Sequence, residues 1–181
     1  MKLSPEDKAA NARDRQIHEC MKSKPKYQRL VAKEFQKMIR AEAGADNRQY
    51  VTAVVNGTIQ QVARRVGQCV CVTCGIVLPW TLPKESPVQM QTGHFLAGRL
   101  ACILFEEDNV SPQCSTCNGH KSGMPQEYRR WMEAVRGTYA IERLEALKRK
   151  SISLDRETLV DMRLEFNRRL KAAELKMKGT P

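Results

Sequence analysis

Two Cys-x-x-Cys pairs constrain the fold of this chain more than any other feature. Cys71 and Cys74 form the first pair, and Cys114 and Cys117 form the second. A Cys-x-x-Cys turn presents two sulfurs to one metal ion with little strain, and structural zinc takes four such ligands at tetrahedral corners. The sequence therefore predicts one structural zinc site built from two distant segments. Cys69 could replace Cys71, although its longer spacing to Cys74 fits the turn less well.

The beginning of the chain lacks the apolar core of a signal peptide, so we expect a cytosolic protein. In that reducing compartment, closely spaced cysteines are better interpreted as metal ligands than as disulfides. Cys20 and Cys102 are expected to be buried free thiols. No run of about eighteen apolar residues occurs, which argues against a membrane span.

Positive charge is concentrated on both sides of the cysteine-rich centre. The net charge is +11, and residues 1–68, 69–123 and 124–181 contribute +7, −1 and +5. A basic balance favours a polyanionic partner, most simply nucleic acid, because each Lys or Arg placed on a phosphate releases condensed counterions. The alternative is a set of solvated basic helices that keep the protein in solution.

Helices are predicted on both flanks. Ser4 caps a first helix to about residue 21, and an apolar stripe predicts a second over 26–43, ended by Gly44. Further apolar stripes cover residues 128–135, 141–147 and 159–177, the last with Ser153 or Asp155 as its cap.

Short extended segments are predicted in the centre. They cover residues 69–72, 76–80, 88–94 and 109–113, with a long surface loop over 96–108. Residues 47–66 fit either a hairpin turning at Asn56-Gly57 or a helix interrupted there. The helix is preferred, because the Gln and Arg residues of this segment are good helix formers.

His94 and Asn118 are the candidates for hydrolytic chemistry. An imidazole accepts a proton near neutral pH, so His94 can serve as a general base. Asn118 follows Cys117 directly and can offer a carbonyl oxygen to a hard cation.

Four motifs of the chain resemble one nuclease family. They are Cys71-Val72-Thr73-Cys74-Gly75, Gly93-His94-Phe95, Asn109-Val110 and Cys114-Ser115-Thr116-Cys117-Asn118-Gly119-His120-Lys121-Ser122-Gly123. The pattern resembles the zinc-stabilised ββα-metal (HNH) endonucleases and, more narrowly, the NinG (Rap) recombination endonucleases of lambdoid phages. The likeness covers residues 68–175, and its last motif is the most specific part.

The resemblance implies an endonuclease that acts on branched DNA, of the Holliday-junction or D-loop type, in the cytosol of a bacterial host. His94 would be the general base, Asn118 a ligand of a catalytic Mg²⁺ or Mn²⁺ ion, and Asn109 a brace of the ββα turn. Gln91 stands where the family usually has an aspartate, and Ser111 where it commonly has a histidine. The predicted DNA contacts are Arg99, His120, Lys121, Arg129 and Arg130.

The expected fold is α+β and mostly helical, with a small zinc-stabilised ββα-metal core flanked by basic helices. Residues 1–67 would form a basic helical region, residues 68–137 the zinc-braced core and residues 138–181 the C-terminal amphipathic helices. A homodimer would suit a symmetric junction. Two other interpretations remain open: a branched-DNA-binding protein that has lost catalysis through Gln91 and Ser111, and a zinc-ribbon interaction adaptor.

Overall fold

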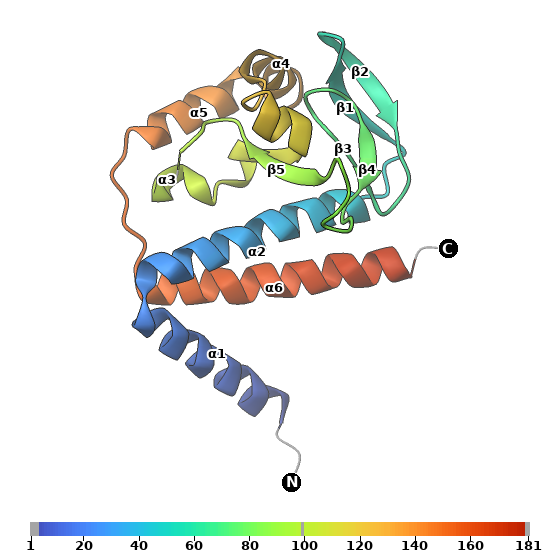
Figure 1. Cartoon of the computed structure of the whole chain (residues 1–181). Helices are drawn as coiled ribbons and strands as arrows, with labels where there is room; N and C mark the ends of the chain where they lie inside the picture. The colour runs from blue at the N-terminus through green and yellow to red at the C-terminus, as the bar shows by residue number, and fades with distance from the viewer. Residues whose placement is uncertain (1–3, 99, 180–181) are drawn as a thin grey trace.

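Residues 4–98 and 100–179 of the chain are described by a computed structural model, in which helices predominate over three small sheets (Figure 1). The helices are α1 (Pro5–Lys22), α2 (Lys24–Ala45), α3 (Ala101–Leu104), α4 (Pro125–Val135), α5 (Thr138–Lys148) and α6 (Arg156–Lys178). Two further helical turns are η1 (Glu107–Asn109) and the π-helical η2 (Thr116–His120). The strands are β1 (Tyr50–Val55), β2 (Thr58–Ala63), β3 (Gln68–Val70), β4 (Val77–Pro79), β5 (Met90–His94) and β6 (Val110–Cys114). The α+β class and the predominance of helix are confirmed.

Helices α2 and α6 lie side by side and form a layer beneath the rest of the chain, while α1 leads away from it (Figure 1). Both run in the same direction, as the ion pairs Glu34–Arg163 and Glu42–Arg169 indicate. Apolar side chains from the two helices meet in one buried cluster that includes Val31, Phe35, Met38, Leu159, Phe166 and Leu170. The apolar stripes predicted for these helices are therefore core faces.

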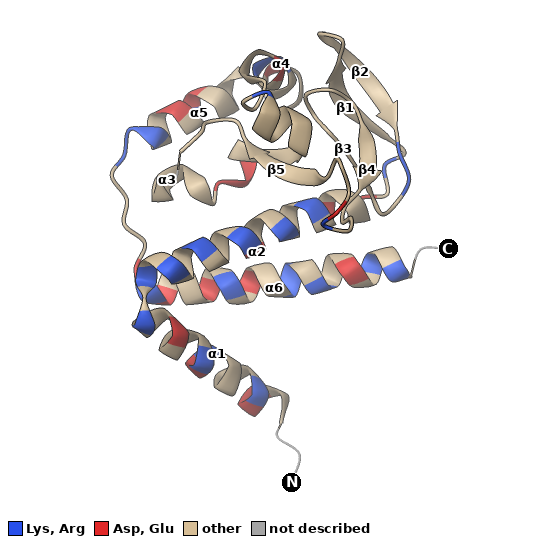
Figure 2. Cartoon of the chain, in the orientation of Figure 1, with Lys and Arg blue, Asp and Glu red and all other residues tan. Residues whose placement is uncertain are grey.

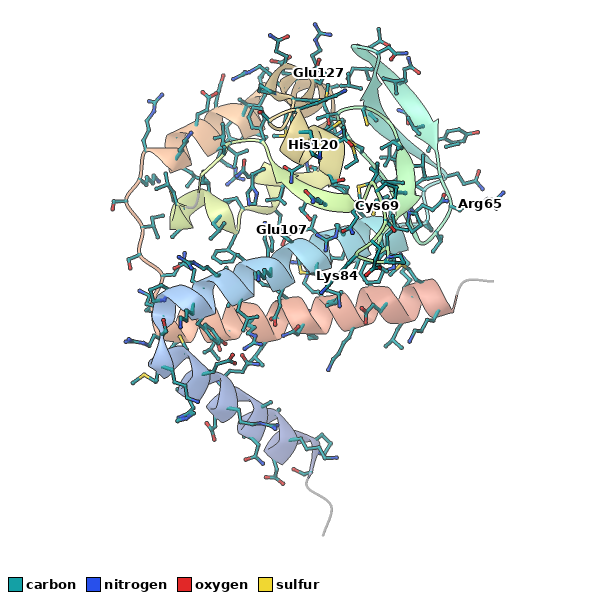
Figure 3. The ribbon with its side chains drawn as sticks, in the orientation of Figure 1. Arg65, Cys69, Lys84, Glu107, His120 and Glu127 are labelled. Atoms are coloured by element: carbon teal, nitrogen blue, oxygen red, sulfur yellow. The ribbon has the colours of Figure 1, made fainter. Side chains whose placement is uncertain are left out.

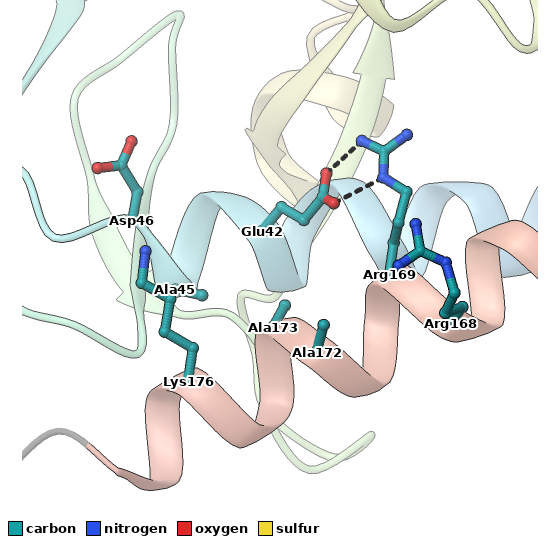
Figure 4. Close-up of a pocket in the computed structure, with 8 residues that line it drawn as sticks. All are labelled: Glu42, Ala45, Asp46, Arg168, Arg169, Ala172, Ala173 and Lys176. Carbon is teal, nitrogen blue, oxygen red and sulfur yellow. Dashed lines mark hydrogen bonds and ion pairs between the residues drawn. The ribbon is translucent and has the colours of Figure 1, made fainter.

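Charged side chains reinforce this contact at its edges. Arg163 donates from Nε to the Glu34 carboxylate at 2.9 Å, and its side chain is only 13% exposed. Arg169 donates from Nε and one Nη to the two oxygens of Glu42, beside a shallow groove floored by Ala172 and Ala173 (Figure 4). Lys and Arg recur along α2, whereas acidic and basic residues alternate on α6 (Figure 2).

The predicted helix starts are confirmed. Ser4 accepts a hydrogen bond from the Asp7 amide and Asp7 reaches back to the Ser4 amide, a reciprocal capping box. Asp155 caps α6 by accepting from the Thr158 amide at 2.7 Å. The predicted end of α2 at Gly44 is wrong, because the helix continues to Ala45. Gly44 is used instead for packing, since a Cβ there would lie 2.9 Å from Trp80 Cβ.

The helix preferred for residues 47–66 is also wrong. Strands β1 and β2 form an antiparallel hairpin whose turn is Asn56-Gly57, with φ of 49° and 78°. Positive φ at both central residues is the signature of a tight type I′ turn, for which Asn-Gly is strongly preferred. Turn chemistry therefore outweighed the helix propensity of the neighbouring Gln and Arg residues.

The centre of the chain contains two further antiparallel pairs, β3 with β4 and β5 with β6. In the second pair Gln91 lies opposite Gln113, Gly93 opposite Ser111 and His94 opposite Val110. The predicted loop over 96–108 is not wholly irregular, because α3 and the start of η1 lie within it. Helices α4 and α5 pack over this region through Tyr128, Trp131 and Leu144.

No helix within residues 4–98 and 100–179 is long and apolar enough to cross a membrane.

Candidate metal centre and adjoining site

The four predicted zinc ligands lie together. The sulfurs of Cys71, Cys74, Cys114 and Cys117 are all within 4.8 Å of one another, and those of Cys74 and Cys114 are 3.8 Å apart. A tetrahedral zinc ion with Zn–S bonds of about 2.3 Å requires its sulfurs to be about 3.8 Å apart. The cluster could therefore hold one metal ion such as zinc.

Local backbone geometry explains why these turns gather their sulfurs. The Gly75 amide donates to the Cys71 carbonyl at 2.8 Å, and the Cys71 amide donates to the Ile76 carbonyl at 2.9 Å. Gly75 has φ of +77°, a conformation that glycine adopts without penalty. In the second turn the Cys117 amide points at the Cys114 sulfur at 3.5 Å. Cys69 is outside the cluster and donates its thiol to the Arg40 carbonyl at 3.2 Å.

The charge state of the thiols also fits a cation. Burial raises the pKa of Cys117 to about 11. The Cys74 thiol donates a hydrogen bond that lowers the pKa of Cys71 to about 5, and the pKa of Cys74 is raised in return. A bound dication would favour the thiolate form of the cysteines that coordinate it.

A second polar pair adjoins the metal centre. The side-chain amide of Asn118 on η2 donates to Gln91 Oε1 on β5 at 2.8 Å. Within the part of the chain that the structure describes, Asn118 Oδ1 accepts no hydrogen bond. Because Cys117 belongs to the cysteine cluster and directly precedes Asn118, the cluster holds these two amides against each other. Their oxygens are neutral ligands that a hard cation can use.

His94 lies at the end of β5 and faces α2. Its Nε2 is 3.3 Å from the Leu104 carbonyl oxygen, and burial lowers its pKa below the ordinary value. It borders a cavity of about 690 Å³ that is also lined by Pro25, Gln28, Arg29, Ala32, Lys33, Gln36, Gly98 and Leu104. Side chains alternate along a strand, so Thr92 and His94 share one face of β5 while Gln91 lies on the other. Among the described residues, no hydrogen bond joins His94 to Gln91 or Asn118.

Asn109 holds the segment between β5 and β6. It is fully buried, its Oδ1 accepts from the Leu96 amide at 2.8 Å, and its Nδ2 donates to the carbonyls of Leu96 and Ile103. This carboxamide thereby ties the end of β5 to α3, which carries the carbonyl that contacts His94.

Two residues for which no role at the site was predicted, Gln113 and Tyr128, also support β5. Gln113 is fully buried and donates to Thr73 Oγ1 and to the Gly123 carbonyl, while its Oε1 has no partner in the described part of the chain. Tyr128 donates its hydroxyl to the Gly93 carbonyl at 3.0 Å. Neither role has a sequence signal, because each depends on a contact between distant segments.

The acidic residues before β6 are already paired. Glu106 and Asp108 bind Arg143, Asp108 also binds Arg136, and Glu107 binds Arg169 (Figure 3 labels Glu107). Recruiting any of them as a metal ligand beside Asn118 would break an ion pair. Among the described residues, the four cysteines are the one group of three or more His, Cys, Asp and Glu side chains placed to hold a metal ion.

The predicted DNA contacts have different surroundings. His120 and Lys121 are exposed at the end of η2, close in sequence to Asn118 (Figure 3 labels His120). Arg129 forms an ion pair with Glu145, and Arg130 donates to the Gly57 carbonyl at 2.6 Å, so both bind other parts of the chain. Arg99 lies outside the described residues.

The chain was compared with models of known protein families, with curated proteins and with solved structures. The model of the family described as Bacteriophage Lambda NinG protein matches residues 2–176. Neither the curated proteins nor the solved structures contain a match.

Proposed function

The chain belongs to the NinG family of bacteriophage lambda, and we propose from this premise that it is a metal-dependent endonuclease that cuts branched DNA during phage recombination. The branched substrate would be a Holliday junction or a D-loop. This function matches the basic flanks of the chain, which favour a polyanionic partner.

The contact between Asn118 and Gln91 carries the proposal. The cysteine cluster joins η2 to β5, and the Asn118 side-chain amide donates to Gln91 Oε1 three residues before His94. Gln91 and His94 lie on opposite faces of β5, so a phosphodiester would have to reach both from the end of that strand. Hard cations such as Mg²⁺ accept carboxamide oxygens and keep several waters in their shell. A divalent ion held by Asn118 and Gln91 would supply the positive charge that a phosphodiester needs as it is cleaved.

His94 would accept the proton of the attacking water. If its Nε2–H donates to the Leu104 carbonyl, the other ring nitrogen, Nδ1, is left as the acceptor. Because burial lowers its pKa, the ring is neutral at pH 7. The water oxygen would bond to phosphorus as the bond to the leaving sugar oxygen breaks. That oxygen would take a proton from solvent water and leave as an alcohol.

Cleavage of a labelled four-way junction with Mg²⁺ or Mn²⁺ tests the proposal. We expect the native protein to cut, and His94→Ala and Asn118→Ala to lose at least about 100-fold in rate, since a general base typically contributes that much or more. His18→Ala is the matched control, because His18 is exposed on α1. No cutting by the native protein, or undiminished cutting by His94→Ala, would overturn this assignment.

A DNA-binding protein without catalysis is the second candidate, and one observation favours it. Gln91 offers a neutral oxygen where the resemblance expects a carboxylate, and the acids of the nearby loop are engaged by arginines. Magnesium in proteins is usually bound by one or two carboxylates. The site could therefore bind a divalent ion too weakly to cut.

Gln91→Asp separates the two candidates. If the native protein binds junctions but does not cut them, the added carboxylate should create metal-dependent cleavage. Gln91→Ala is the control, because it removes the amide without adding charge. A histidine at position 111 is a poor test, since Ser111 is 2% exposed and lies opposite Gly93 in the sheet. Zinc content with no preference for branched over linear DNA would instead support an interaction adaptor.

A further inference from the structure

One face of α2 carries a row of polar residues that passes beside β5. Arg29, Lys33, Gln36 and Arg40 follow one another at steps of four, three and four residues, which places them on a single stripe of the helix. Arg29, Lys33 and Gln36 line the same cavity as His94. The stripe therefore leads along α2 to the candidate general base.

The outer cations of this stripe have no internal partners. Within residues 4–98 and 100–179, the side chains of Arg29 and Lys33 make no ion pair and no hydrogen bond, and both residues are exposed. The acids of α2 are occupied elsewhere, because Glu34 and Glu42 bind arginines of α6. None of the described residues that line the cavity is acidic. The positive charges of Arg29 and Lys33 at the cavity are therefore not neutralised by these acids.

Arg40 extends the positive charge inward. It donates from Nη1 to Thr92 Oγ1 at 2.9 Å, and Thr92 in turn donates to the Gln36 carbonyl at 2.9 Å. Its Nε is buried without a partner, and no carboxylate in the described part of the chain pairs with it. A poorly solvated guanidinium without a counter-charge raises the electrostatic potential around it, which favours the approach of an anion.

We propose that the cavity between α2 and β5 binds the backbone of one DNA strand, with Arg29 and Lys33 on its phosphates and Arg40 adding to the field that attracts them. This inference rests on the proposed action on DNA and names the surface that holds the strand at His94. Arg29 to Gln36, the part of the stripe that lines the cavity, spans about 10 Å along the helix, close to the axial rise of about three nucleotides of one strand. Helix α2 would thus deliver the scissile phosphate to His94, which gives the N-terminal region a role in positioning the substrate.

Salt-dependent binding to a four-way junction, without added Mg²⁺ or Mn²⁺, tests the surface. Arg29→Ala/Lys33→Ala should reduce the slope of log Kobs against log salt concentration by about 2 and weaken binding about tenfold or more at 0.1 M salt. Arg149→Ala/Lys150→Ala is the matched control. It removes two exposed charges at the end of α5 that do not line the cavity, and should change the slope less.

Equal slopes for the native protein and Arg29→Ala/Lys33→Ala would overturn the inference. An equal loss of junction affinity in the two double variants would overturn it as well. Circular dichroism of each variant checks that its helices are retained. Binding is measured independently of cleavage. If the protein binds through the stripe but does not cut, only the nuclease proposal is contradicted. Where the native protein cuts, Arg29→Ala/Lys33→Ala should also cut more slowly at saturating DNA, because the phosphate is misplaced beside His94.

Discussion

Gly93 has no room for a side chain. A Cβ there would lie 2.1 Å from Gln113 Oε1 and 3.0 Å from its Cδ. Gln113 cannot move aside freely, because it is fully buried and donates two hydrogen bonds. The glycine next to His94 is therefore required by its cross-strand neighbours, independently of any part in catalysis.

Gly93→Ala should lower the free energy of unfolding by about 1 to 3 kcal/mol, the usual cost of forcing extra atoms into a packed core. Urea denaturation measures the change. Gly119→Ala is the control, since a Cβ at Gly119 would meet nothing within 4 Å and its φ is not positive. Equal stabilities for the two variants would show that Gln113 does not confine Gly93.

The lowered pKa of His94 makes stability depend on pH in a defined direction. Between the folded pKa and the ordinary value of about 6.5, the unfolded chain binds more protons than the folded one. The contribution of a neutral His94 is therefore complete above about pH 6.5 and is lost as the pH falls through the folded pKa. His94→Gln should lose less stability than the native protein between pH 7.5 and 5.5, as measured by urea unfolding. An identical pH dependence in both proteins would contradict the burial of this ring.

Elements with a local chemical signal were predicted from the sequence, and those decided by distant contacts were not. Capping side chains at Ser4 and Asp155 and the spacing of the cysteines act within a few residues, and each appears in the structure as expected. The end of α2 was wrongly predicted at Gly44, because this glycine makes room for Trp80, 36 positions away in the sequence, and does not end the helix. The polar stripe on α2 is visible in the sequence as residues at helical spacing. The helix was predicted from its apolar positions alone, so this stripe was not recognised.

A metal ion in the cysteine cluster should stabilise the segments that the cluster joins, because β6 and η2 carry one pair of cysteines while the other pair follows β3. Cys74→Ser is expected to reduce bound zinc from about one ion per chain and to lower the free energy of unfolding by about 3 to 4 kcal/mol, the contribution of a ligand well above its Kd. Elemental analysis and thermal unfolding measure both effects. Cys69→Ala should retain the metal, since its sulfur lies outside the cluster. If Cys69→Ala lost its zinc and Cys74→Ser kept it, Cys69 would be a ligand and Cys74 would not.

The contact between α2 and α6 depends on a poorly exposed ion pair. Arg163→Met would leave Glu34, whose side chain is 20% exposed, without its principal charged partner. We expect a loss of about 1.5 to 3 kcal/mol, the range for hydrogen bonds to charged groups. Arg168→Met is the control, because Arg168 is 71% exposed and pairs with Glu165 on the surface, where such pairs contribute about 0 to 1 kcal/mol. Thermal unfolding of both variants, with Glu34→Gln added to each, separates the pair from general packing.

The whole molecule is held together by α2, which contacts α6 on one side and β3, β5 and β6 on the other. The hairpin of β1 and β2 joins the same body, since the Val54 amide donates to the Val72 carbonyl and the Val72 amide to the Pro112 carbonyl. Unfolding either side alone would expose the apolar face of α2 that this side covers. We therefore expect the helical layer and the cysteine-rich centre to unfold together.

Two tryptophans report on the two sides of this body. Trp80 packs against α2 near the cysteines, and Trp131 lies on α4 and donates from Nε1 to the Thr52 carbonyl at 2.8 Å. In Trp131→Phe the fluorescence comes from Trp80 alone, and in Trp80→Phe from Trp131 alone. For each variant, the urea midpoint from fluorescence should equal its own midpoint from far-ultraviolet circular dichroism, which follows mainly the helices. If the Trp131 signal changed at a urea concentration where the helices were still intact, the centre would be a separate unit. In that event α2 would be ordered without β5, and its cations would not be held in place beside His94.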